Sequence, residues 1–348
     1  MAYTTINKST DYFNTKLYTG NGSTNAITGV GFQPDWLWLK DRSAGGGHIL
    51  VDAVRGNNKS LSSQDGNAEV TRTDIVTAFN SDGFTLGADS GNFVNVSGNN
   101  GVGWNWKANG QGSANTDGSI NTTYTSANTT AGFSISLFTG TGSNETVGHG
   151  LGVAPEWVIV KGVNNTGSWT SYHKSLGATK YMHLSETDAQ ATASSVWNST
   201  APTNQVFSVG AGVQSGSGNT YVAYCFAPKR GFSAMGSYTG NGSSSSPPFI
   251  YTGFKPAFVM LKVSSTTDSW NMYDNRRNGY NGTGARLRAD VSNAEDTGTA
   301  YQTCDFYSNG FAPQGNDTTS NGSGNTYIFM AFAEAPLVGS NNVPCTAR

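Results

Sequence analysis

Hydrophobic residues occur along the whole chain in short runs that are separated by turn residues. The run after Pro34 reads Trp-Leu-Trp-Leu with no polar alternation, which is typical of a strand that is buried on both faces. Asp82-Gly83 and Asn309-Gly310 stand between such runs, and pairs of this kind supply the positive φ angles that tight hairpins use. Many short strands joined by turns predict an all-β chain.

Three segments share an ordered series of landmarks. Each opens on an aromatic residue followed by Thr-Gly-x-Gly, continues with a Pro-led apolar run, and closes on an aromatic strand. The openings begin at Tyr18, Phe138 and Tyr238, the apolar runs at Pro34, Pro155 and Pro256, and the closing strands end at Ala108, Ala227 and Ala333. Each series spans about 90 residues, and this agreement in order and spacing predicts three tandem small β-sandwich repeats that are jelly-roll-like.

The landmarks divide the chain into repeats and connections. The Gly/Asn/Thr-rich connection between the first two repeats is expected to be flexible or loosely docked, and the short second junction is expected to hold the last two repeats together. The predicted parts are an N-terminal arm (1–15), repeat 1 (16–108), a linker (109–131), repeat 2 (132–228), repeat 3 (229–335) and an irregular C-terminal tail (336–348).

The composition excludes several classes of protein. Charged residues are 12 % of the chain, about half the usual quarter, but aromatics are 11 %, which argues against disorder. Because 20 basic residues face 22 acidic ones, no nucleic-acid partner is expected. No apolar run reaches the roughly 18 residues of a membrane span, so membrane insertion is not expected either.

The N-terminus and the cysteines indicate the compartment of synthesis. The first residues have no hydrophobic signal core, so no signal peptide is predicted. Cys225, Cys304 and Cys345 are odd in number and widely spaced, which predicts free thiols, two in strands and one in the tail. Both observations favour synthesis in a reducing cytoplasm.

Several longer strings of the chain resemble repeat proteins of marine tailed bacteriophages. They are Ala-Tyr-Thr-Thr-Ile (2–6), Gly-Phe-Gln-Pro-Asp-Trp-Leu-Trp-Leu-Lys (31–40), Val-Asp-Ala-Val-Arg-Gly (51–56), Phe-Asn-Ser-Asp-Gly-Phe-Thr-Leu-Gly (79–87) and Ala-Phe-Ala-Glu-Ala-Pro (331–336). The chain is similar to this family over nearly its whole length. The resemblance implies a virion protein made in the host cytoplasm, structural or part of a tail appendage, and it brings no active site with it.

The acidic residues do not form a repeated catalytic pattern. Glycoside hydrolysis needs two carboxylates that face one cleft. Asp52 and Asp274 occupy matching positions, but His173 stands there in the second repeat. Each of these two aspartates precedes an arginine by three residues, which indicates a structural ion pair. We therefore expect no enzyme and no catalytic residue.

Other chemical motifs are absent from the sequence. The four histidines share no metal-ligand spacing, no nucleophile elbow occurs, and the glycine-rich stretches lack the Gly-Lys-Ser/Thr ending of a phosphate loop. No metal and no cofactor are predicted. Lys40, Lys161 and Lys262 end the Pro-led runs and are expected to extend their apolar stems over the edge of a sheet.

Glycan contact is the remaining hypothesis for a binding site, because sugar sites combine aromatic faces with amide donors in loops. One loop is unusually polar and basic and differs from its counterparts in the other repeats. For the two tryptophans, core packing is the alternative, since they recur at one repeat position and begin a strand. The candidates are Arg276, Arg277, Asn278, Tyr280 and Asn281 in the loop, and Trp169 and Trp270.

These observations lead to a functional hypothesis with two alternatives. The first reading is a tail fibre or appendage that contributes to attachment to host-surface glycans, assembled with other virion proteins and as a homotrimer. The second is a capsid decoration or head-fibre protein whose arm, residues 1–15, docks on the shell. The third is a polysaccharide depolymerase.

Overall fold

Nearly all secondary structure in this protein is antiparallel strand. The computed structural model describes residues 3–212, 214–277, 279, 281, 284–297 and 303–338. Within these residues the only helix is the three-residue 3-10 turn η1 (Ser9–Asp11). The all-β prediction is confirmed. Of the predicted tail, residues 339–348 lie outside the described part.

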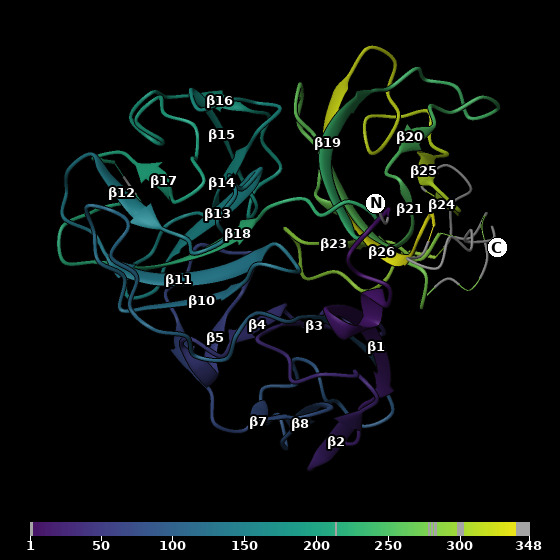
Figure 1. Ribbon diagram of the computed structural model, residues 1–348. Coiled ribbons are helices and arrows are strands. Elements are labelled where there is room, and N and C mark those ends of the chain that lie inside the picture. The colour runs from purple at the N-terminus through teal and green to yellow at the C-terminus, as the bar shows by residue number, and fades with distance from the viewer. Residues whose placement is uncertain are drawn as a thin grey trace.

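The strands form three lobes, which surround a common centre (Figure 1). The first lobe (residues 13–106) holds β1 (Phe13–Thr19), β2 (Asn25–Thr28), β3 (Trp36–Asp41), β4 (Ile49–Asp52), β5 (Gly56–Leu61), β6 (Val70–Thr71), β7 (Val76–Asn80), β8 (Gly83–Leu86) and β9 (Asn100–Trp106). The second lobe (residues 124–226) holds β10 (Tyr124–Asn128), β11 (Phe133–Thr139), β12 (Glu145–Gly148), β13 (Trp157–Gly162), β14 (Thr170–His173), β15 (Lys180–His183), β16 (Ala191–Thr192), β17 (Val206–Val209) and β18 (Thr220–Phe226). The third lobe (residues 233–336) holds β19 (Ser233–Thr239), β20 (Ile250–Tyr251), β21 (Phe254–Val263), β22 (Asn271–Asp274), β23 (Leu287–Arg288), β24 (Cys304–Tyr307), β25 (Gly310–Pro313) and β26 (Thr326–Pro336).

The large sheets of the three lobes have corresponding strand orders. These are β1-β9-β3-β4-β5-β6, β10-β11-β18-β13-β14-β15-β16 and β19-β26-β21-β22-β23. The registers correspond as well, since Trp36 pairs with Trp106, Trp157 with Phe226 and Phe258 with Phe332. A duplication that gave rise to the three lobes stays a prediction, which this shared order supports.

Each lobe is a sandwich of its large sheet and a small sheet. The small sheets are β2-β8-β7, β12-β17 and β20-β25-β24. In the first lobe, Leu37 and Leu39 of β3 point to one face and pack in a cluster with Ile27 and Phe84 of the small sheet. The alternating residues Trp36 and Trp38 belong to a different cluster, on the opposite face. Both faces of β3 are buried, which explains its apolar run without alternation.

The inner faces of the large sheets meet in one aromatic core. Trp36 of the first lobe stacks on Tyr224 of the second at 4.5 Å between ring centroids, and Phe13 stacks on Phe332 of the third at 4.9 Å. Phe226 and Phe332 join the second and third lobes at 6.1 Å. A buried aromatic side chain removes roughly 150–250 Å² from water, so each contributes on the order of 4–6 kcal/mol. The lobes are therefore held together by hydrophobic burial.

Two series of hydrogen bonds pass around the centre from lobe to lobe. In the first series a backbone N–H donates to a carbonyl of another lobe: Glu69 to Val163 (2.8 Å), Gln190 to Ser264 (2.9 Å) and Glu295 to Arg42 (2.8 Å). In the second a ring N–H donates to a carbonyl: His48 to Arg288 (2.9 Å), Trp169 to Ser62 (2.8 Å) and Trp270 to His183 (2.9 Å). In each series the donors occupy corresponding positions in the three lobes. Each lobe is bonded to the next in turn, so each series forms a closed cycle around the centre.

The histidine of this cycle has a defined tautomer. Trp38 Nε1 can only donate, and it lies 2.8 Å from Nδ1 of His48, which must accept. Nε2 therefore carries the proton toward the Arg288 carbonyl. Burial lowers the pKa of His48 to about 3, so this ring stays neutral.

Three lysines end inside the protein, which corrects the expectation that they extend over a sheet edge. Lys40, Lys161 and Lys262 are fully buried. Each ammonium donates to the carbonyl of the next residue, at 2.6, 2.8 and 2.7 Å. Lys262 also reaches the Thr187 carbonyl of the second lobe at 3.2 Å. Burial lowers the pKa of each lysine to about 8, because the charged form loses its hydration.

The two predicted Asp–Arg pairs are confirmed as structural ion pairs. Arg55 Nε lies 2.6 Å from Asp52 Oδ2, and Arg277 Nε lies 2.6 Å from Asp274 Oδ2, with all four side chains buried. Both carboxylates also accept from another lobe: Tyr224 Oη donates to Asp52 at 2.7 Å and Trp104 Nε1 donates to Asp274 at 3.0 Å.

The predicted linker and arm are both packed against the lobes. Residues 124–128 of the linker pair with β11, so the expectation of a loosely docked connection is wrong there, because the backbone groups at the edge of β11 take β10 as a partner. In the arm, Ile6 is buried, and Tyr3 Oη donates to the Gly253 carbonyl at 2.7 Å.

The two expected Gly turns differ in their backbone. Gly83 has φ +143°, and a Cβ there would lie 2.0 Å from the Ile27 carbonyl oxygen. Gly310 does not have the positive φ that we expected. A Cβ at Gly310 would lie 2.2 Å from the Ile250 carbonyl oxygen, so close approach of the backbone excludes a side chain there.

We predict that Arg277→Leu lowers the free energy of unfolding by about 3–5 kcal/mol, because it leaves the Asp274 carboxylate buried without its cation. Chemical denaturation measures the change. Lys174→Ala is the control, since it breaks an exposed ion pair with Glu156 and should cost less than about 1 kcal/mol. Equal losses in the two variants would contradict the buried pair's role.

We predict that Lys161 makes the protein more stable as pH rises from about 8 toward 10.5. The folded protein holds its pKa near 8, below that of the unfolded chain, so the folded state releases this proton first. The stability of wild type relative to Lys161→Met should therefore rise by up to about 1.4 kcal/mol per pH unit. Denaturation curves at several pH values test this, and a stability difference that stays constant across this pH range would contradict it.

Candidate functional site

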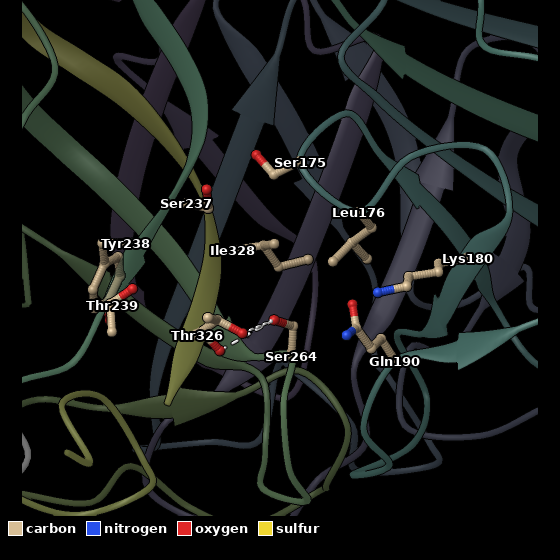
Figure 2. A pocket seen from close by; sticks show the side chains of 10 residues that line it. All are labelled: Ser175, Leu176, Lys180, Gln190, Ser237, Tyr238, Thr239, Ser264, Thr326 and Ile328. Atoms are coloured by element: carbon tan, nitrogen blue, oxygen red, sulfur yellow. Dashed lines mark hydrogen bonds between the residues drawn. The ribbon is translucent and has the colours of Figure 1, made fainter. Parts of the chain in front are cut away.

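A polar groove of about 360 Å³ lies between the second and third lobes (Figure 2). The second lobe contributes the turn after β14 and two side chains near β15 and β16. The third lobe contributes its first and last strands and the end of β21. The lining residues are Ser175, Leu176, Lys180, Gln190, Ser237, Tyr238, Thr239, Ser264, Thr326 and Ile328.

The contacts between lobes fix the shape of this groove. The Gln190 N–H donates to the Ser264 carbonyl, which joins the two walls. The Ser264 hydroxyl lies 2.9 Å from the Thr326 hydroxyl and donates to the Thr326 carbonyl at 3.1 Å. Lys262 joins the same two lobes, because its ammonium donates to the Thr187 carbonyl. The walls of the groove are formed by strands and are held in place by contacts between the lobes, so the groove is preformed.

The chemistry of the groove is that of a polar binding site with one cationic group. Hydroxyl groups, the Gln190 carboxamide and the Lys180 ammonium supply hydrogen-bond donors and acceptors, and Leu176 and Ile328 add apolar surface. Figure 2 shows the Lys180 and Gln190 side chains on one side of the groove, facing Ser264 and Thr326. None of the described lining residues is acidic. Such a site can hold a hydroxylated ligand but has no pair of carboxylates to cleave it.

A second groove, of about 290 Å³, lies at the corresponding place between the third and first lobes. Arg276 lines it from the third lobe, opposite Lys16 and its neighbours on β1. Both grooves lie between the first strand of one lobe and the turn after the His173 or Asp274 position of another. Of the candidate contact residues, the structure places Arg276 in a surface groove, with its side chain exposed.

The rest of the candidate loop has structural roles or lies outside the described residues. Arg277 is buried in its ion pair with Asp274, which corrects the expectation of a surface contact. Asn281 is exposed, but its amide pairs with the backbone of Phe306, donating at 3.0 Å and accepting at 2.9 Å. Asn278 and Tyr280 lie outside the described residues.

The two candidate tryptophans are core residues. Trp169 and Trp270 are both fully buried, and the ring N–H of each donates to a carbonyl of another lobe. The expectation of glycan contact through these rings is wrong in this conformation, and the packing alternative holds. Their recurrence at one repeat position reflects the contact between lobes.

The ionisable residues outside the groove were compared with the geometry of a metal site and with the predicted free thiols. In the part of the chain that the structure describes, no group of three or more His, Cys, Asp or Glu side chains is placed to hold a metal ion. Cys225 and Cys304 are free, as predicted, and burial raises the pKa of both thiols; Cys345 lies outside the described residues.

Sequence reasoning missed the groove residues for a physical reason. Ser and Thr are common in this chain, so Ser264 and Thr326 carry no local signal, and no motif around Gln190 sets it apart. They meet only because the second and third lobes pack at this angle. Lys180 had a weak signal, since lysines are rare here and this one ends no apolar run.

A family model described as "Domain of unknown function (DUF7483)" matches residues 8–336. The chain belongs to this family. The matched range includes strands of all three lobes, so the family unit is the whole three-lobed assembly, in agreement with its shared core. No curated protein matches the chain. Among the described residues, no helix has the length and apolar character needed to cross a membrane.

We predict that Trp270→Phe lowers the free energy of unfolding by roughly 1–3 kcal/mol, because the His183 carbonyl loses its buried donor. Chemical denaturation measures this loss. Ligand binding in the grooves should be unchanged, which separates a packing role from a contact role. A stable variant that loses binding would contradict the packing assignment.

Proposed function

We propose that this protein is a non-enzymatic virion protein of a tail appendage that contributes to attachment to host-surface glycans. The phage setting rests on the resemblance of the long sequence strings. The binding role rests on one observation, a preformed groove lined by hydroxyl, carboxamide and ammonium groups. Sugar hydroxyls pair with groups of these kinds.

The groove favours binding over cleavage. Hydrolysis of a glycoside needs an acid and a second carboxylate on either side of the bond. The strongest acidic candidates, Asp52 and Asp274, are buried and paired with arginines away from the groove. The groove's own charged group is the Lys180 ammonium, which suits an acidic or neutral saccharide.

The packing of the N-terminal arm weakens the capsid-decoration alternative. That alternative uses residues 1–15 to dock on a shell. In the described residues the arm packs on the protein itself, through Ile6, Tyr3 and the Arg230 guanidinium, which lies 4.4 Å from the centre of the Tyr3 ring. An arm held in this way is not free to serve as a tether.

Two grooves in one rigid chain favour attachment by avidity. The polar groove and its counterpart at Arg276 lie between different pairs of lobes, so one molecule offers two places for the same kind of ligand. Several copies on one particle multiply these weak contacts, because after the first has formed the others bind at a high effective concentration.

We predict that purified protein binds bacterial surface polysaccharides on a glycan array and that Lys180→Ala/Gln190→Ala weakens this binding at least tenfold, about 1.4 kcal/mol. Lys59→Ala is the matched control, because it removes the same charge from the first lobe, away from both grooves. Equal binding by the double variant would contradict the assigned groove.

Two further measurements separate the alternatives. Release of new reducing ends from a bound polysaccharide would contradict the non-enzymatic role. Gold-labelled antibody that decorates the capsid and leaves the tail bare would contradict the appendage, and a copy number near that of the shell lattice would favour decoration.

A further inference from the structure

The third lobe has an apolar cleft of about 390 Å³ beside its first strand. The cleft lies between β19 and β20, and it shares Ser237 and Tyr238 of β19 with the polar groove. Two aromatic side chains at its rim are unusually open to solvent, Phe249 at 50 % and Tyr251 at 59 %. Exposed aromatic surface of this kind marks places where another molecule packs.

The backbone beside this cleft is an open sheet edge. Among the described residues, β26 is the one strand that pairs with β19, which forms the end of its sheet; an isolated bridge joins its first residue, Ser233, to Lys229. Strands at such edges offer unpaired N–H and C=O groups to any extended chain that approaches. The cleft therefore combines main-chain hydrogen-bonding groups with an apolar pocket.

The second lobe shows what covers the corresponding edge. There β10 pairs antiparallel with β11 from Tyr124 to Asn128. Just before β10, Ile120 is buried in the core of the lobe, and its N–H donates to the Thr146 carbonyl of β12. In the third lobe β20 takes the place of β12, since Val147 pairs with Phe207 as Ile250 pairs with Phe311.

The first lobe protects its edge in a different way. Lys16 of β1 pairs with Gly103, at the register position where Gly236 of β19 pairs with Phe329. A lysine on an edge strand opposes further pairing, because its charge would have to be buried. Glycine at this position leaves the edge of β19 without that protection.

The connections between lobes explain the difference. The chain reaches the second lobe through residues 107–123, which is enough to place β10 across the edge of β11. It reaches β19 through residues 227–232, which turn directly into the strand. No preceding segment is left to cover β19.

We propose that the open edge of β19 and its cleft bind an extended segment of another protein chain. The segment adds as an antiparallel strand beside β19, and an apolar side chain before it packs against Ile250 between Phe249 and Tyr251. None of the described residues that line the cleft is charged, so the matching segment is uncharged there and rich in Ser, Thr or small residues, as Tyr124–Asn128 is. This is strand addition, in which the main chain gives affinity and the pocket gives specificity.

The test uses a labelled synthetic peptide with the sequence of residues 118–129, added to the full chain and followed by fluorescence anisotropy. We expect saturable binding that Phe249→Ser/Tyr251→Ser weakens at least tenfold. Val70→Ser/Val153→Ser is the control, because it removes two other exposed large apolar side chains elsewhere, and it should bind as wild type does. Hydrogen exchange should show new protection of the β19 amides.

Several results would overturn the proposal. They are the absence of saturable peptide binding, equal binding by the Phe249/Tyr251 variant, or protection at strands other than β19. A dimer in sedimentation that this variant dissociates would make a second copy the occupant. Binding that requires removal of residues 339–348 would make the chain's own end the occupant.

Discussion

The shared aromatic core forces each large sheet to bury both of its faces. One face packs on the small sheet of its own lobe, and the other packs on the two neighbouring lobes, as Trp36 does on Tyr224. Polar groups at the ends of these sheets therefore have no access to water and must find partners inside. This constraint accounts for the carbonyl and carboxylate partners of the buried lysines, of the two buried arginines and of the ring N–H groups of Trp169 and Trp270.

The same constraint explains why the lobes lock in a cycle. A polar group at a strand end faces the neighbouring lobe. At one corresponding position of the three lobes, His48, Trp169 and Trp270 therefore each donate a ring N–H to a carbonyl of another lobe. The grooves follow from this cycle, since each lies where the first strand of one lobe leaves space beside a turn of the next.

The three lobes differ at the edge strands of their large sheets, and these differences give the lobes different possible roles. The second lobe covers its edge with β10, the first places Lys16 there, and the third leaves glycine beside an aromatic cleft. A rigid scaffold with one protected, one covered and one open edge can carry a ligand groove between lobes and a protein contact at the open edge.

The sequence by itself determined the all-β class, the landmark series and the two Asp–Arg pairs. These depend on local patterns, namely apolar runs, turn residues and an i,i+3 spacing, which the chain carries in any context. Only the tertiary structure decided that Lys161 is buried, that Trp270 is a core residue, and that Lys180 and Gln190 face Ser264 across a groove. The physical reason is that burial and convergence depend on how the lobes pack around the centre, and that packing joins residues far apart in the chain.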